Sequence, residues 1–228
     1  MKRMFSIWTT LMVLCWATQV FSQTPKLIAL DSSANQKPHN VKAEQVQHKG
    51  RKALRVIDDA PPNTGDGGRL LILKGTDFKN GVIEVELAGE PMASAVAGGA
   101  RGFVGIAFRV LDEGAKFECF YLRPTNGRAD DQVRRNHSTQ YISHPDFPWQ
   151  KLRKEFPERY ESYVDLMPSE WTKVKIEVTG TKAKLYVHGA SQPALIVNDL
   201  KLGETNGAIA LWVGPGTIAH FSKLLVSQ

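Results

Sequence analysis

The sequence predicts an all-β protein built as a sandwich or a barrel. Short segments in which apolar and polar side chains alternate recur along the chain, as expected for strands that bury one face. Glycine, proline, asparagine and aspartate cluster between these segments, where turns are needed. Regular short strands separated by turns are typical of antiparallel sandwiches and barrels.

The alternation places the expected strands in order along the chain. They are predicted at residues 41–46, 52–57, 69–73, 81–89, 103–110, 117–123, 171–178, 182–189, 194–200, 207–214 and 219–226. Lys49 and Gly50 are a turn signal between the first two, which predicts a hairpin. A loop rich in proline, glycine and aspartate follows at 58–68, and a flexible loop of small residues is expected at 92–102.

The segment 123–163 shows no strand alternation, and we interpret it as a long inserted loop. Connections of this length are uncommon inside a compact domain and are usually functional. The part of the segment before Pro157 has a weak helical period, which predicts one or two turns of helix. The whole segment is dense in guanidinium groups and aromatic rings, more than a plain connection needs.

Residues 1–22 predict a secretory signal peptide, because two basic residues precede an apolar run and small residues stand before Gln23. We therefore expect a periplasmic or secreted protein whose mature chain, 23–228, is a single domain. Leu14 occupies the position before Cys15 where a lipoprotein signal needs a small residue, which argues against a lipid anchor. No later segment is apolar enough for a membrane span of about 20 residues.

Charge and cysteine content narrow the class of partner. The formal net charge is +6, and it falls to +4 when the two basic residues of the signal peptide are removed. This bias is weaker than a nucleic-acid-binding stripe, and no nucleic-acid-binding motif accompanies it. An anionic polysaccharide suits a mildly basic exported protein better. Cys119 is the remaining cysteine of the mature chain, so we expect no intramolecular disulfide.

Alternation also sorts each strand into two faces. The aliphatic set, which we expect in the core, includes Ile106, Phe108, Leu185 and Leu211. The opposite face of the strand 103–110 carries Gly105, Ala107 and Arg109, and these small residues would leave room for a ligand beside the arginine. Replacing Arg109 should then cost far less stability than truncating Phe108. In the strand 117–123 we expect Phe120 and Leu122 to point inward and Glu118 to lie at the strand edge.

Planar donors beside aromatic faces suit a ligand that carries oxygen atoms and an apolar ring face, such as a sugar or a uronate. The predicted ligand-binding residues are Arg109, Tyr121, Arg123, Arg134, Arg135, Gln140, Trp149 and Trp212. If the long segment folds over the sheet, several distant side chains should converge on one site. These are Arg109, Arg123, Arg134, Arg135, His137 and Tyr141.

Four stretches carry a resemblance to a known family. They read FKNGVIEVELAG, GFVGIAFRV, WTKVKIEVTGTKAKLYVHG and GAIALWVGPGTIAHFSKLLV, and together they lie within residues 78–123 and 171–226. They resemble the laminin-G-like, concanavalin A-like jelly roll, and within it the bacterial 3-keto-disaccharide hydrolase-type domains. The resemblance implies a sandwich of two antiparallel sheets. It specifies the fold far better than an activity, and it does not extend to the segment 123–163.

Candidate catalytic residues are Glu84, Glu118, His137 and Tyr141. Glu84 and Glu86 share a strand face at a separation of roughly 7 Å, within the range of a hydrolytic pair, but the central aspartate of the glucanase pattern is missing. His137 and Tyr141, with nearby amide and guanidinium groups, supply the residue types of a lyase that acts on a uronate. The hydrolase-like resemblance adds Arg109 and Glu118 as chemical groups. No metal-ligand spacing and no cofactor motif is found, so we expect neither.

The sequence therefore predicts an exported β-sandwich that binds or processes an oligo- or polysaccharide, with a basic and aromatic site on the concave sheet. Two alternatives stay open at this point. One is a glycoside hydrolase or polysaccharide lyase that acts on an anionic glycan, and the other is a protein-docking module built on the long segment.

Overall fold

The computed structural model describes residues 24–61, 64 and 68–228. Its strands are β1 (Lys26–Leu27), β2 (Gln36–His39), β3 (Val41–His48), β4 (Arg51–Asp58), β5 (Leu70–Phe78), β6 (Gly81–Pro91), β7 (Val104–Leu111), β8 (Lys116–Leu122), β9 (Thr139–His144), β10 (Glu161–Ser162), β11 (Thr172–Thr179), β12 (Lys182–Val187), β13 (Leu195–Val197), β14 (Gly207–Val213) and β15 (Thr217–Ser227). The short helices are α1 (Gln132–Asn136) and α2 (Trp149–Glu155), and 3-10 turns occupy η1 (Ser33–Asn35), η2 (Ala93–Ala95), η3 (Asp112–Gly114) and η4 (Pro124–Asn126). The predicted signal peptide and mature start lie outside the described residues.

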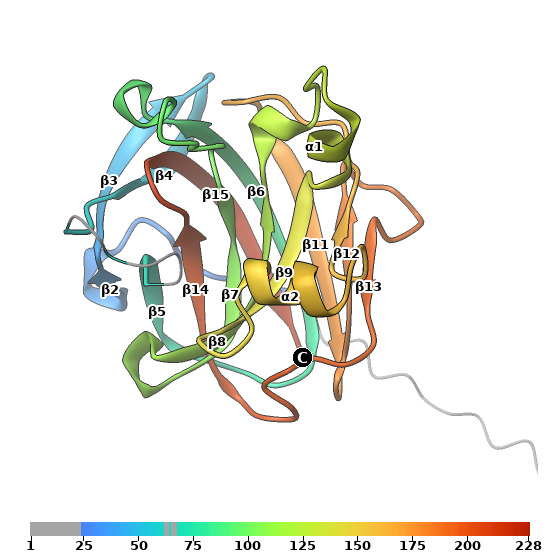
Figure 1. Cartoon of the computed structure of the whole chain (residues 1–228). Helices are drawn as coiled ribbons and strands as arrows, with labels where there is room; N and C mark the ends of the chain where they lie inside the picture. The colour runs from blue at the N-terminus through green and yellow to red at the C-terminus, as the bar shows by residue number, and fades with distance from the viewer. Residues whose placement is uncertain (1–23, 62–63, 65–67) are drawn as a thin grey trace, which may run out of the picture.

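Two antiparallel sheets pack face to face (Figure 1). The β6 sheet has the order β13-β12-β11-β6-β15-β4-β3, and β1 pairs with the end of β15. The β8 sheet has the order β10-β9-β8-β7-β14-β5-β2. Every predicted strand is present, although the one expected at 194–200 is reduced to β13. The all-β sandwich of two antiparallel sheets is thus confirmed.

The segment 123–163 is not a long loop. It contains β9, which pairs with β8 from Phe117 opposite His144 to Leu122 opposite Thr139, and β10, which pairs with β9. Alternation was not visible because every residue from 139 to 143 is buried, the polar Thr139, Gln140 and Ser143 among them, so polarity does not mark a solvent-exposed face of β9. The predicted helical turns are present as α2, which lies in front of the sheet (Figure 1).

The core lies between the sheets and follows the predicted aliphatic face. Ile106, Phe108, Leu185 and Leu211 are each no more than 1% exposed. Phe120 points inward as expected and stacks on Phe108 at 6.3 Å between ring centroids. Glu118 was expected at a strand edge, but it shares this inner face and is wholly buried. The strand pairing explains this placement, because Glu118 stands directly opposite Phe108.

Arg109 does not project above the sheet, which corrects the face assignment. The pairing of β7 with β8 shifts register between Phe108 and Leu111, and Arg109 has a φ of 53° at this bulge. The bulge turns the guanidinium toward one end of the sandwich, where it is fully buried. There it donates to the carbonyl oxygens of Lys79 (2.8 Å), Gly180 (2.7 Å) and Gly203 (2.7 Å). Arg109 therefore ties three loops together.

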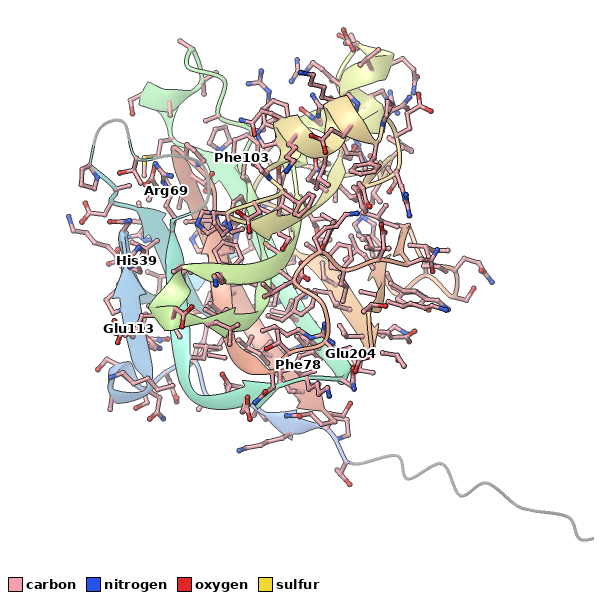
Figure 2. All side chains as sticks on the ribbon, turned by 60° about the horizontal axis from the view of Figure 1, so that its bottom comes forward. His39, Arg69, Phe78, Phe103, Glu113 and Glu204 are labelled. Carbon is pink, nitrogen blue, oxygen red and sulfur yellow. The ribbon has the colours of Figure 1, made fainter. Side chains whose placement is uncertain are left out.

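Figure 2 shows the two ends of the sandwich. Phe78 and Glu204 lie at the end that Arg109 holds, toward the bottom of the view. Phe103 and Arg69 lie toward the top. The loop that connects β6 and β7 belongs to this second end, and it borders the candidate site.

Candidate functional site

A pocket of about 350 Å³ opens on the outer face of the β8 sheet. Neighbouring strands supply its base through Tyr121 of β8, Ile142 of β9 and Trp212 of β14. Phe103 and Trp149, the first residue of α2, add aromatic walls. Small residues complete the rim, namely Ala95, Gly98, Gly99, Ala100, Pro215 and Gly216. The pocket thus joins three of the rings that the sequence proposes for ligand binding with one, Phe103, that it did not.

The rings at the base pack closely on one another. Tyr121 and Trp212 lie with centroids 4.6 Å apart and planes tilted by 31°, and Phe103 meets Tyr121 edge-on at 6.1 Å. Gly105 makes this packing possible, because a Cβ there would approach the Cβ of Tyr121 to 2.6 Å. The expected space above Gly105 therefore holds Tyr121. A Cβ on Gly214 would likewise collide with Phe103 at 2.5 Å.

The loop from 92 to 102, which was expected to be flexible, is held in place by backbone contacts. Met92 donates its N–H to the carbonyl of Gly216 at 2.7 Å. Gly102 has a φ of 71°, and a Cβ on Gly89 would meet the carbonyl oxygen of Gly102 at 2.3 Å. A Cβ on Gly216 would meet the Cβ of Ala95 at the same distance of 2.3 Å. Glycine is needed where the loop crosses these strands so closely.

A buried ion pair supports the same wall of the pocket. Arg69 donates to Asp58 at 2.6 Å, and both side chains are largely buried. The other carboxylate oxygen of Asp58 accepts the backbone N–H of Gly216 at 2.7 Å. The Asp58 carboxylate therefore fixes the turn between β14 and β15 on which the loop from 92 to 102 rests.

The arginines beside the pocket are balanced by a carboxylate that sequence reasoning missed. Glu161 of β10 is buried, and Arg123 donates to it at 3.1 Å while Arg153 donates at 2.9 Å. The ring of His137 lies 3.5 Å from the same carboxylate. Arg123 also donates to Gln140 at 2.9 Å. A buried guanidinium needs such a partner, and that need is the one signal in the sequence for a hidden carboxylate.

This cluster shifts two pKa values. Burial raises the pKa of Glu161, but the hydrogen bond from Arg153 and the charges of Arg123 and Arg153 outweigh burial and hold it below its usual value. Burial lowers the pKa of His137, and the nearby arginines lower it further against the opposing charge of Glu161. Glu161 is therefore the ionised group of the cluster, and a neutral imidazole is favoured beside it.

The same arginines position the aromatic walls. The guanidinium of Arg153 lies 4.6 Å from the ring centroid of Trp149, and that of Arg123 lies 5.8 Å from it. Arg123 also donates to the hydroxyl of Tyr121 at 2.9 Å. Gln140 is wholly buried, and its amide donates to the Tyr141 carbonyl at 2.8 Å. Arg123 and Gln140 thus support the pocket from behind rather than lining it.

The candidate catalytic residues lie apart. Glu84 is exposed on the β6 sheet opposite Lys175. Glu118 and Tyr141 meet in the interior, where the tyrosine hydroxyl donates to the carboxylate at 2.6 Å and Leu202 donates its N–H at 2.7 Å. Burial raises the pKa of both side chains. Together with His137 beside Glu161, these residues occupy three separate places, and none of them lines the pocket.

The predicted convergence of six residues on one site does not occur. Arg109 is held at the far end of the sandwich, and Tyr141 points into the core. Arg134 and Arg135 lie on α1, where Arg135 donates to the hydroxyl of Tyr163 at 2.9 Å. Alternation could not show this, because the bulge in β7 turns Arg109 away from the sheet face and because β9 is buried on both faces.

Metal and membrane features are also absent from the described part of the chain. No group of three or more histidine, cysteine, aspartate or glutamate residues within 24–61, 64 and 68–228 could hold a metal ion. Cys119 is buried, and burial raises the pKa of its thiol well above the usual value. No helix among the residues described here is long and apolar enough to cross a membrane.

Comparisons with known proteins identify the fold. No protein-family model matches the sequence, and no curated protein matches it significantly. A carbohydrate-binding module from Bacillus subtilis superposes with a TM-score of 0.52 at 12% identity, covering 83% of this chain and 95% of the module. A Bacillus subtilis protein of unknown function with a galectin-like fold superposes with a TM-score of 0.55 at 11% identity, covering 91% of this chain and 97% of that protein. A native glycosidic hydrolase superposes with a TM-score of 0.51 at 12% identity, covering 92% of this chain and 97% of the hydrolase.

These similarities extend over nearly the whole of the described sandwich. The narrower resemblance to 3-keto-disaccharide hydrolase-type domains stays a prediction. With its two antiparallel sheets and these structural neighbours, the chain has a concanavalin A-like jelly-roll fold.

Proposed function

We propose that the chain binds a carbohydrate in the aromatic pocket of the β8 sheet. The C–H face of a sugar ring is apolar and weakly positive, and it complements the negative face of an aromatic ring. Tyr121, Trp149 and Trp212 offer such faces in one pocket. Its volume of about 350 Å³ lies at the small end of the range for ligand sites, which suits a short segment of a glycan.

One observation carries the proposal. Trp212 is only 2% exposed, yet its indole Nε1 has no hydrogen-bond partner among the described residues. Buried donors are nearly always paired, because an unpaired one loses its bonds to water without compensation. Because the Nε1 atom is itself buried, a ligand hydroxyl would accept this N–H only after the small residues of the rim shift, while the ring of the sugar packs against the aromatic walls. This combination of an apolar face and an oxygen acceptor is what a sugar presents.

Binding is favoured over hydrolysis because Tyr121 is the only titratable side chain among the described residues that line the pocket, and its hydroxyl accepts a hydrogen bond from Arg123. None of the described residues that line it is an aspartate, a glutamate or a histidine. Hydrolysis needs two carboxyl groups within about 5–10 Å of each other on either side of the scissile bond. Glu84 and Glu118 belong to different sheets, and Glu118 is engaged by Tyr141 and Leu202 inside the core.

The test is a glycan array with neutral and acidic oligosaccharides, followed by calorimetry on the hits. Trp149→Ala removes one wall and should weaken binding about 30-fold, since truncating a central aromatic contact costs on the order of 2 kcal/mol. Trp212→Phe keeps a ring but removes the N–H, and should weaken binding several-fold, as expected for one hydrogen bond.

Trp171→Phe is the matched control. Trp171 precedes β11 of the other sheet and contacts His48 edge-on at 5.3 Å, so its replacement should leave glycan affinity unchanged. Wild-type protein that binds no glycan on the array would refute the proposal. Equal affinities for wild type and Trp149→Ala would refute this pocket as the site.

A further inference from the structure

Near the pocket and on α1, the guanidinium groups of Arg101, Arg134 and Arg135 lack a carboxylate partner among the described residues, and that of Arg135 donates to the hydroxyl of Tyr163 instead. Arg101 follows the rim residue Ala100 directly, and its guanidinium donates to the Ala100 carbonyl at 3.1 Å. Arg134 is exposed on α1. Within the described residues neither side chain forms an ion pair, and the Arg134 side chain has no hydrogen bond. These two positive charges are therefore not neutralised inside the protein.

Short contacts bring the rim loop and α1 together. Thr125 of η4 donates its backbone N–H to the carbonyl of Arg101 at 3.3 Å. Asn126, the next residue, donates its side-chain amide to the carbonyl of His137, where α1 ends, at 3.1 Å. In agreement with this arrangement, burial and the positive charges of Arg134 and Arg123 all lower the pKa of Arg101.

Three carboxylates of this region are engaged elsewhere. Glu161 neutralises Arg123, as described above, and Asp165 pairs with Arg128 at 2.7 Å. Asp131 caps α1 by accepting the backbone N–H of Arg134 at 2.8 Å rather than its guanidinium. Like charges held close together raise the energy of the free protein unless an anion offsets them.

We propose that the sugar bound in the aromatic pocket carries a carboxylate or a sulfate group, and that Arg101 and Arg134 bind this group at the rim. A guanidinium presents paired N–H donors that match the oxygen atoms of either anion. The rings would hold the body of the sugar and the two arginines would select for charge. This inference rests on the proposed carbohydrate function and adds the class of ligand to it.

The test compares three oligosaccharides of one backbone, which are neutral, uronate-bearing and sulfated, by calorimetry at two salt concentrations. An acidic form should bind at least about tenfold more tightly than the neutral one, and this preference should shrink at high salt. Arg101→Gln and Arg134→Gln should each remove most of the preference while affinity for the neutral sugar stays the same. The uronate and sulfated arms show which anion is preferred.

Arg128→Gln is the matched control, because Arg128 lies in the same segment but is paired with Asp165. It should leave both affinities unchanged. If Arg101→Gln fails to fold, the exposed Arg134→Gln decides the test. Equal binding of neutral and acidic sugars, or equal loss of both in the glutamine variants, would overturn this inference and leave the proposed function standing. Absence of binding to all three sugars and to the array would overturn both.

Discussion

Replacing Glu161 by glutamine should destabilise the protein strongly although the shape of the side chain hardly changes. The Glu161 side chain is 3% exposed and that of Arg123 is 5% exposed, so the change leaves a buried guanidinium without its counter-charge. Removing one partner of a buried pair costs about 3–5 kcal/mol. Arg153 is 35% exposed, and solvent screens its share of the loss. Because Gln140 remains as an acceptor for Arg123, we expect a loss near 3 kcal/mol.

The assay is urea denaturation at pH 7, followed by tryptophan fluorescence. Glu158→Gln is the control, since Glu158 is an exposed carboxylate in the turn just before β10 and its loss should change stability by less than about 0.5 kcal/mol. The Glu161→Gln variant should also bind the glycan less tightly, because Arg153 and Arg123 lie against Trp149. A destabilisation below about 1 kcal/mol would refute the reasoning, because Arg123 would then not depend on Glu161.

The pH dependence of the same variant has a definite sign. The pKa of Glu161 is depressed in the folded protein, so the carboxylate stabilises the fold at pH values above its unfolded pKa of about 4.3. This contribution is lost as the pH falls through the folded pKa. Wild type and Glu161→Gln should therefore differ most at neutral pH and approach each other in acid. Parallel stability curves would contradict the assignment.

Two further outcomes follow from the buried polar groups. Arg109→Met should lower the free energy of unfolding about as much as Phe108→Ala, on the order of 3–5 kcal/mol, because three loop carbonyls lose their hydrogen-bond donor. A urea denaturation midpoint close to that of wild type would contradict this. Burial and the charges of His48 and Arg55 lower the pKa of His220 to about 4. Between this pH and about 6.5 the folded protein therefore binds fewer protons than the unfolded chain. The free energy of unfolding should fall as the pH drops through this window. His220→Phe keeps a ring to stack on His48 and should lose this component, by up to about 3 kcal/mol, which denaturation at pH 4.5 and 7 would measure. Equal pH slopes for the variant and wild type would exclude His220 as the cause.

The alternation of apolar and polar residues was sufficient to predict which side chains point inward wherever a strand has one buried and one solvated face. The strand that became β12 alternates visibly for this reason, and its inward residue Leu185 was predicted correctly. The same reasoning separated Tyr121 and Trp212 from the aliphatic set, and the structure places both of them in the pocket. The glycine and alanine content of the loop from 92 to 102 predicted its small side chains but not its order, which depends on contacts with Gly89 and Gly216.

The remaining features depend on neighbours that are distant in sequence. A strand covered on both sides, such as β9, has no solvent-exposed face, and polar residues such as Gln140 are buried in it, so polarity does not alternate with exposure and the segment reads as a loop. A bulge changes the face of every residue beyond it, which is why Arg109 lies at the end of the sandwich instead of over the sheet. The partner of Arg123 comes from a residue 38 positions away, because strand pairing sets that distance and local composition does not.

The amino-acid sequence was thus sufficient to predict the two-sheet sandwich, its core residues and the aromatic residue types that line the pocket, since these follow from local periodicity and composition. Which of those side chains meet in one pocket, and which are engaged in the interior, depended on strand order, register and the bulge in β7. Those features arise from hydrogen bonding and packing between segments far apart in the chain, and a local pattern carries no information about such pairs.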